Sequence, residues 1–206
     1  MSGAIAYDFL FCRGGAEKLT LAVAEGIRDT DIVVSFRDRG IFTDDEMAPF
    51  NCHELGSKPR MSLRGWRTLL GLYRFRGRAR MLANYDWVIF SGSVAPEGVW
   101  NRPRGRNLYY CHTPPRVAYD LYDYYAEQVP ALLRPAFRLF VGFVRKRYRA
   151  ALARMDVILA NSANVQQRLY RYLGVDSVVV HPPCDTKGFH WLADEGYFVS
   201  TARLEP

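Results

Sequence analysis

Apolar residues along this chain form short runs that alternate with stretches of helical spacing. Seven short runs rich in β-branched and aromatic residues predict strands, at 4–11, 31–36, 50–55, 86–92, 107–111, 156–162 and 177–183. Between them, apolar residues recur every three or four positions and predict helices at 17–27, 61–82, 132–154 and 162–174. Strands that alternate with helices indicate an α/β fold, in which helices cover both faces of a parallel sheet.

The end of the chain departs from this alternation. Residues 197–202 form another apolar run, which predicts one more strand. No later element is present to pair with this strand or to cover it, so we expect the sequence to be a fragment of a longer protein. The expected organisation is one domain at 1–190, followed at 191–206 by a linker and the first strand of a second domain.

Candidate chemistry lies where predicted strands end. In parallel sheets of this kind, ligands bind at the carboxyl ends of the strands. The strand at 107–111 stops at His112, and two prolines, Pro114 and Pro115, stiffen the exit. A neutral imidazole held at this edge can form a hydrogen bond with a sugar hydroxyl, although a histidine packed in the core is the structural alternative. The small residues at 91–93 end a neighbouring strand.

Gly14 and Gly15 separate the first predicted strand from the first helix. A turn without side chains lets a ligand approach backbone N–H groups at the positive end of a helix. The segment is neither GxGxxG nor a Walker loop, which counts against dinucleotide and P-loop ATP binding. A purely structural turn remains the alternative. Near the other strand ends, Arg116 suits a phosphate or carboxylate, and Ser162 is typical of a helix N-cap.

The net charge of +7 is concentrated in two segments. Eight basic residues and no acid lie between Lys58 and Arg80, and seven basic residues and no acid lie between Arg134 and Arg154. Such clusters indicate an anionic partner, which could be phospholipid, nucleic acid or pyrophosphate. Nucleic acid is disfavoured because no aromatic-glycine signature of a nucleic-acid module is present. The helix at 132–154 either packs on the sheet with solvated arginines or rests on anionic lipid.

Several classes of protein are disfavoured by what the sequence lacks. No signal-peptide pattern and no apolar run of spanning length are present, so we expect a cytoplasmic or peripheral location. Four cysteines stand singly without a CxxC pair, which disfavours a disulfide framework or a zinc knuckle. Two Cys–His neighbours, at 52–53 and 111–112, leave a metal site open as a minor alternative.

Five segments, in their order and spacing, resemble retaining glycosyltransferases of family 4, and their bacterial mannosyltransferase-like branch in O-antigen and exopolysaccharide synthesis above all. These segments are RGGAEKL (13–19), YYCHTPPRVAYDL (109–121), VILANSANVQQRLYRYLG (157–174), VVVHPPCDT (178–186) and YFVSTARLEP (197–206). The resemblance implies the two-domain GT-B fold. In this fold a Rossmann-like N-terminal half holds the acceptor and a C-terminal half holds the nucleotide-sugar. This chain corresponds to the N-terminal half and is expected to be inactive alone, because the paired glutamates of the other half are absent.

The resemblance also implies roles for individual residues. Gly15, with Gly14 beside it, matches the glycine whose backbone approaches the donor phosphate and sugar. His112 matches the catalytic-site histidine that contacts the donor sugar, and Arg203 matches the arginine that neutralises the leaving diphosphate. The acceptor side is assigned to Arg116, Tyr119 and Ser162.

The expected reaction is transfer of a hexose, mannose from GDP-mannose by the family branch, to a lipid-linked or polysaccharide acceptor. Neither a metal nor a cofactor is implied. The expected partners are the nucleotide-sugar donor, a lipid-linked saccharide acceptor and the anionic inner face of the bacterial plasma membrane. One alternative is a non-catalytic basic module that binds membranes or polyanions. Another is a different Rossmann enzyme, such as an epimerase or dehydrogenase, against which the missing GxGxxG counts.

Overall fold

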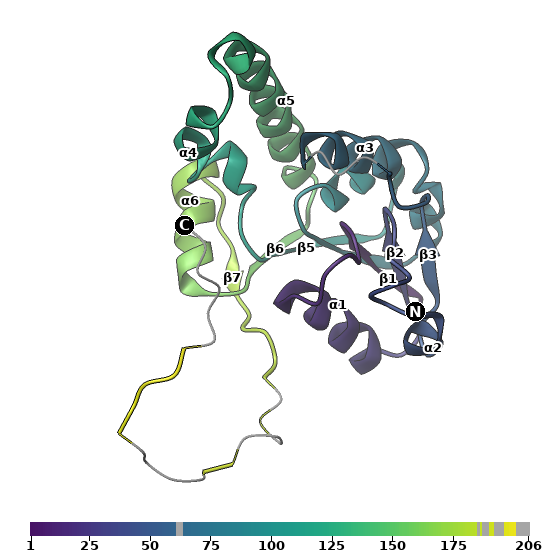
Figure 1. Ribbon diagram of the computed structural model, residues 1–206. Coiled ribbons are helices and arrows are strands. Elements are labelled where there is room, and N and C mark those ends of the chain that lie inside the picture. Colours follow the sequence, from purple (N-terminus) through teal and green to yellow (C-terminus); the bar gives the residue numbers. More distant parts are fainter. Residues whose placement is uncertain (61–63, 185, 187–189, 192–195, 201–206) are drawn as a thin grey trace.

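The computed structural model describes residues 1–60, 64–184, 186, 190–191 and 196–200 (Figure 1). In these ranges one sheet is formed by β1 (Gly3–Tyr7), β2 (Thr30–Val34), β3 (Cys52–Glu54), β4 (Trp87–Ser91), β5 (Arg106–Cys111), β6 (Val157–Ala160) and β7 (Val178–Val179). The strand order is β3-β2-β1-β4-β5-β6-β7, and every neighbouring pair is parallel. The predicted Rossmann-like α/β fold is confirmed.

Helices connect the strands. The α-helices are α1 (Gly15–Gly26), α2 (Asp44–Met47), α3 (Arg64–Gly77), α4 (Tyr122–Glu127), α5 (Arg134–Leu152) and α6 (Ala163–Leu173). Short 3₁₀ helices lie at η1 (Arg80–Asn84), η2 (Ala95–Asn101), η3 (Arg116–Ala118) and η4 (Ala131–Leu133). Among the described residues, no helix has the length and apolar character needed to cross a membrane.

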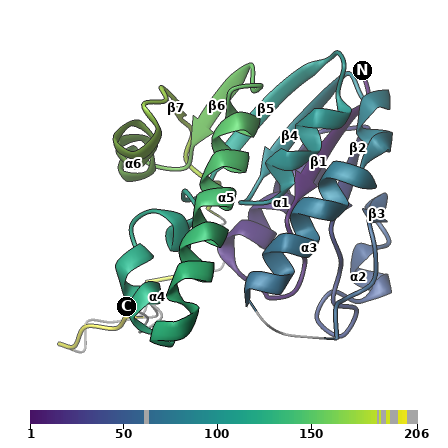
Figure 2. The ribbon, with the colours of Figure 1, turned by 90° about the horizontal axis from the view of Figure 1, so that it is seen from above.

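The sheet separates two apolar cores. Helices α3 and α5 and the η2 segment lie over one face (Figure 2), where they bury Ala4, Ala6, Val33, Val88, Phe90, Tyr109 and Cys111. On the other face α1 and α2 cover Ile5, Tyr7, Ile32 and Val34. The two sets alternate along each strand, because successive side chains of a strand point to opposite faces of a sheet. Helix α6 adds Val165 and Leu169 to the first core.

A buried acid joins the two basic helices. Glu97 of η2 has only 1% of its side chain exposed, and it forms ion pairs with Arg76 of α3 and Arg147 of α5. Near this acid, the guanidinium groups of Arg76 and Arg154 both stack over the ring of Trp100. Part of each basic segment is therefore internal structure, which neither the solvated nor the lipid-bound interpretation anticipated.

Some predicted bounds were wrong. The first strand ends at Tyr7 rather than residue 11, because Asp8 turns toward the start of η2. The strand predicted at 177–183 is limited to β7 (Val178–Val179). Pro182 and Pro183 lack the N–H groups that would extend it. The expected strand at 197–202 is absent over Tyr197–Ser200, and residues 201–202 lie outside the described residues.

The predicted helix at 61–82 also differs from the structure. Residues 61–63 lie outside the described residues, α3 ends at Gly77, and η1 replaces the last predicted turn. Helix α3 runs through both Gly65 and Gly71 without a break. A Cβ at Gly71 would lie 2.8 Å from a methyl carbon of Val94. Close packing on η2, rather than a helix break, therefore accounts for this glycine.

Candidate active site at the carboxyl edge of the sheet

The register of the sheet brings the predicted site residues to one face. Tyr7 of β1 is paired with Ser91 of β4, and Ser91 is paired with Tyr110 of β5. Side chains at paired positions point to the same side, which here is the face covered by α1. His112 follows Tyr110 by two positions and continues on that face just beyond the end of β5. The turn at Gly15, where α1 begins, adjoins the same edge.

His112 is held from two directions. Its ring Nε2 lies 2.9 Å from Ser91 Oγ in a hydrogen bond, and its ring meets that of Tyr110 edge-on at 5.3 Å between centroids. The backbone oxygen of His112 accepts a hydrogen bond from Asn161 Nδ2 at 3.1 Å. Ser162 Oγ in turn donates to Asn161 Oδ1 at 3.0 Å. The contacts with Ser91 and Tyr110 hold the imidazole, and the contact with Asn161 holds the backbone of His112 at the end of β5.

The imidazole of His112 is neutral at physiological pH. Burial lowers the pKa of His112 to about 4, because the charged ring would lose its solvation. A neutral imidazole has one nitrogen that donates and one that accepts a hydrogen bond. With Nε2 engaged by Ser91, this side chain is suited to a polar, uncharged partner such as a hydroxyl group.

Asp8 is a site residue that sequence reasoning missed. Its carboxylate accepts hydrogen bonds from the backbone N–H groups of Ser93 (2.6 Å), Val94 (2.9 Å) and Ala95 (2.8 Å). Burial raises the pKa of Asp8 to about 6, although the three N–H donors act in the opposite direction. Gly92 has φ +102° and a Cβ there would lie 2.4 Å from the Asp8 carboxylate, so this turn requires glycine. A lone acid inside the apolar run at 4–11 was the available signal.

The two glycines of the first turn have different surroundings. Gly14 is the N-cap of α1, and a Cβ there would lie 2.6 Å from Glu17 Oε2. Glu17 is 5% exposed and accepts a hydrogen bond from Cys12 Sγ at 3.3 Å. Burial first, and then the charge and hydrogen bond of Glu17, raise the pKa of Tyr7 far above its ordinary value. At Gly15, by contrast, no described atom lies within 4 Å of an added Cβ, so its backbone borders open space.

The residues assigned to the acceptor side each have contacts within the domain. Arg116 is exposed and pairs with Asp120 at 3.2 Å, and Asp120 also pairs with Arg168 of α6 at 2.7 Å. The ring of Tyr119 stacks on that of Tyr172 at 5.3 Å, which makes it part of the packing between η3 and α6.

The remaining predicted residues have clear placements. Ser162 caps α6 by accepting a hydrogen bond from Val165 N at 3.3 Å, which is the structural role stated for it, and it also orients Asn161. Arg203 lies outside the described residues.

The Cys–His neighbours do not converge on a metal. Within the described ranges, no group of three or more His, Cys, Asp or Glu side chains is placed to hold a metal ion. Cys111 belongs to the core under α5, 3.9 Å from the Tyr148 hydroxyl, and burial raises the pKa of its thiol to about 11. His112, its neighbour, points to the opposite face. His53 Nε2 lies 3.2 Å from Asp31 Oδ2.

The site thus consists of a neutral histidine and an open glycine turn at the carboxyl edge of a parallel Rossmann-like sheet, the edge at which such sheets bind ligands. The model of the Glycosyltransferase Family 4 domain matches residues 13–187. The chain belongs to this family. No curated protein matches the sequence.

An epimerase and a glycotransferase are among the solved structures that are similar to the chain. A UDP-N-acetylglucosamine 2-epimerase is 11% identical with a TM-score of 0.47, over 87% of this chain and 47% of that chain. The glycotransferase of kitacinnamycin is 12% identical with a TM-score of 0.46, over 95% of this chain and 56% of that chain. The chain thus spans about half the length of these two proteins.

Proposed function

We propose that this chain is the acceptor-side domain of a retaining GT-B glycosyltransferase. Residues 1–190 form that domain, and residues 191–206 lead into a second domain that holds the nucleotide-sugar. The enzyme moves a hexose to a lipid-linked or polysaccharide acceptor. The observation that carries this proposal is the neutral His112, held by Ser91 beside an open glycine turn in a chain that belongs to Glycosyltransferase Family 4.

The proposal gives each side of the site a role. The backbone N–H groups at Gly15 lie at the positive N-terminal end of α1, where they can bind the phosphates of a nucleotide-sugar. His112 forms a hydrogen bond with a hydroxyl of the transferred sugar. When the bond between the sugar and the diphosphate breaks, negative charge develops on the diphosphate, and stabilising that charge lowers the barrier. Arg203 is the proposed cation for this step, and neither a metal nor a cofactor is part of the proposal.

The donor and the location are part of the same proposal. GDP-mannose is the proposed donor, and the inner face of a bacterial plasma membrane is the proposed location of the acceptor. Support for membrane contact comes from the outer side of α5, where Leu139 is 77% exposed and Phe143 is 46% exposed among basic residues. On α3, Tyr73 is 62% exposed and Trp66 is 45% exposed. Apolar side chains flanked by cations suit an anionic lipid surface.

Transfer by the two-domain enzyme tests the role of His112. We expect His112→Ala to lower turnover with GDP-mannose by at least about 100-fold, the size of effect seen when one well-placed polar contact is removed. His53→Ala is the matched control, because His53 pairs with Asp31 away from the site and its replacement should leave turnover within about twofold of wild type. Near-normal turnover of a folded His112→Ala enzyme would make His112 a structural residue.

A further inference from the structure

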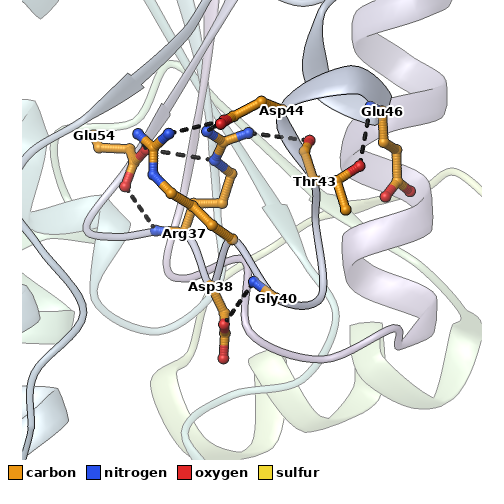
Figure 3. Close-up of polar contacts among 8 residues, drawn as sticks. Arg37, Asp38, Gly40, Thr43, Asp44, Glu46 and Glu54 are labelled. Carbon is orange, nitrogen blue, oxygen red and sulfur yellow. Dashed lines mark hydrogen bonds and ion pairs between the residues drawn. The ribbon is translucent and has the colours of Figure 1, made fainter.

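Apart from the site around His112, a pocket lies at the carboxyl ends of β2 and β3. It has a volume of about 640 Å³, and its lining includes Arg37, Asp38, Arg39, Glu54, Gly56 and Lys58. Figure 3 shows the polar contacts that surround Arg37 and Asp38 beside this pocket. We propose that this pocket is a binding site for a phosphate group.

The charges on the pocket wall balance one another. Asp44 pairs with both Arg37 and Arg39, the latter at 2.8 Å. Glu54 likewise lies 2.8 Å from Arg39 and 3.4 Å from Arg37. The ion pairs of the wall therefore join two arginines to two acids.

The rim of the pocket adds one further ion pair. Lys58 Nζ lies 2.5 Å from Asp38 Oδ2, and Asp38 Oδ1 also accepts a hydrogen bond from Gly40 N at 3.1 Å. Wall and rim together hold three cations and three carboxylates, so the wall and rim are neutral overall.

Two arginines behind the wall add charge that no acid balances. Arg74 of α3 is 6% exposed and donates to the backbone oxygens of Ser35 (3.0 Å) and Ser57 (2.8 Å). Arg78, one turn later, donates to Leu55 O at 3.3 Å. Among the described residues, no carboxylate pairs with either guanidinium, and burial together with the charge of Arg78 lowers the pKa of Arg74. The local balance is therefore five cations to three acids.

The buried guanidinium groups also have unused donors. The Nε of Arg74 is buried and makes no hydrogen bond within the described part of the chain, whereas the buried Nε of Arg37 has only its 3.4 Å ion-pair contact with Glu54. Burying a polar group without a partner costs free energy, and burying an unbalanced cation costs more. An anion in the pocket would offset this cost through its charge. The pocket is thus built for a negative ligand that the protein itself does not supply.

Gly56 brings the excess charge close to the pocket. It lines the cavity, and a Cβ there would lie 2.8 Å from Arg74 Cζ and 2.9 Å from Arg74 Nε. The guanidinium therefore lies directly behind a wall that carries no side chain. Arg39 of the wall is 63% exposed and Lys58 of the rim is 57% exposed, so both side chains can reach an incoming ligand. Planar guanidinium forks together with a point-charged ammonium favour a phosphate with several acceptor oxygens.

The pocket opens on the same edge of the sheet as His112. Strand β2 lies between β3 and β1 in the sheet, and all the strands are parallel. A phosphate-bearing acceptor could therefore span from this pocket toward the histidine. This extension rests on the proposed function, whereas phosphate binding itself does not.

Calorimetric titration of the 206-residue chain with sodium pyrophosphate at low ionic strength tests the site. The pocket variant Arg39→Gln/Lys58→Gln removes two exposed cations of the pocket and leaves the buried Arg37 and Arg74 in place. The control variant Arg104→Gln/Arg171→Gln removes the same charge from exposed positions elsewhere. We expect saturable binding by the wild type and by the control variant, and an affinity at least about tenfold weaker for the pocket variant.

Two results would overturn the site: no saturable binding by the wild type, or equal weakening in the pocket and control variants, which would indicate a general effect of net charge. A second titration, in the presence of phosphatidic acid vesicles, identifies the source of the phosphate. Competition by the vesicles assigns the pocket to a lipid headgroup, and undisturbed pyrophosphate binding assigns it to a soluble phosphate. Because no transfer is measured, failure here is distinct from failure of the proposed function.

Discussion

At the scale of single residues, His112 and Asp8 illustrate two kinds of information. His112 was predicted from local signals, since an apolar run ends at it and two prolines follow. Asp8 was missed because its partners, the N–H groups of residues 93–95, are 85 to 87 positions away in sequence. The contact of His112 with Ser91 was also missed, although both strand ends had been noted. The periodicity of apolar residues predicts which residues of a strand or helix share a face, but it does not predict which residues of different elements are in contact.

The two glycines of the first turn allow structure and function to be separated. We expect Gly14→Ala to lower the free energy of unfolding by about 1–2 kcal/mol, because its Cβ would displace the buried Glu17 carboxylate. Gly15→Ala should leave that free energy within about 0.5 kcal/mol, because its Cβ enters open space. Urea denaturation of the chain measures both effects.

Turnover of the two-domain enzyme completes this comparison. Under the proposed function, Gly15→Ala should lower turnover at least about tenfold, because a methyl group blocks the approach of the donor to the backbone. Equal losses of stability in the two variants would show that both glycines are structural. Full activity of a stable Gly15→Ala enzyme would contradict the proposed role of Gly15 in binding the donor.

At the scale of elements, the arginine-rich segments are partly explained by internal contacts. Helices α3 and α5 lie on one face of the sheet (Figure 2). Each contributes an arginine that pairs with Glu97. Arg145 of α5 donates to Ala118 O at 2.5 Å, and Arg149 donates to Tyr172 O at 2.8 Å. A count of basic residues therefore overestimates the charge that is free to meet a partner. The sequence gives no means of telling the two kinds of arginine apart, since both occur in the same run.

Replacement of Glu97 tests the connection between these helices. We expect Glu97→Gln to lower the free energy of unfolding by about 3 kcal/mol, because one partner of a buried ion pair is lost and two cations remain. Thermal or urea unfolding of the chain measures this change. Glu127→Gln is the control, because this acid lies on the exposed side of α4 and its replacement should change stability by less than about 0.5 kcal/mol. A similar small change for Glu97→Gln would contradict the role of the ion pairs.

At the scale of the whole molecule, two features are relevant to a membrane: the exposed apolar residues of α5 and the basic residues of α3 and α5. Leu132 of η4 is 90% exposed and lies just before α5, on which Leu139 and Phe143 are also exposed. In Figure 2, α5 and α3 lie next to each other on one side of the sheet. The proposed membrane contact therefore combines apolar insertion with electrostatic attraction, and these two contributions respond differently to salt.

Co-sedimentation with vesicles tests this contact. We expect the chain to pellet with phosphatidylglycerol vesicles but not with phosphatidylcholine vesicles at low salt. The variant Leu139→Gln/Phe143→Gln should reduce the bound fraction at least about fivefold at 0.15 M salt, where screening has weakened the electrostatic contribution. The control Tyr197→Gln/Val199→Gln changes two exposed apolar residues outside the helices and should bind like wild type. Equal recovery of the wild type in both supernatants would contradict membrane binding.

The sequence by itself determined the seven strands of the parallel sheet, the four longer helices between them and the position of His112 at the end of β5, but not the short helices α2 and α4. These features depend on the alternation of apolar residues and on prolines and glycines, which act within a few positions of the chain. Only the tertiary structure decided that Asp8 holds the turn after β4, that Glu97 joins α3 and α5, and that Arg74 stands behind the pocket at β2 and β3. Such contacts depend on strand register and helix packing, which join residues far apart in sequence.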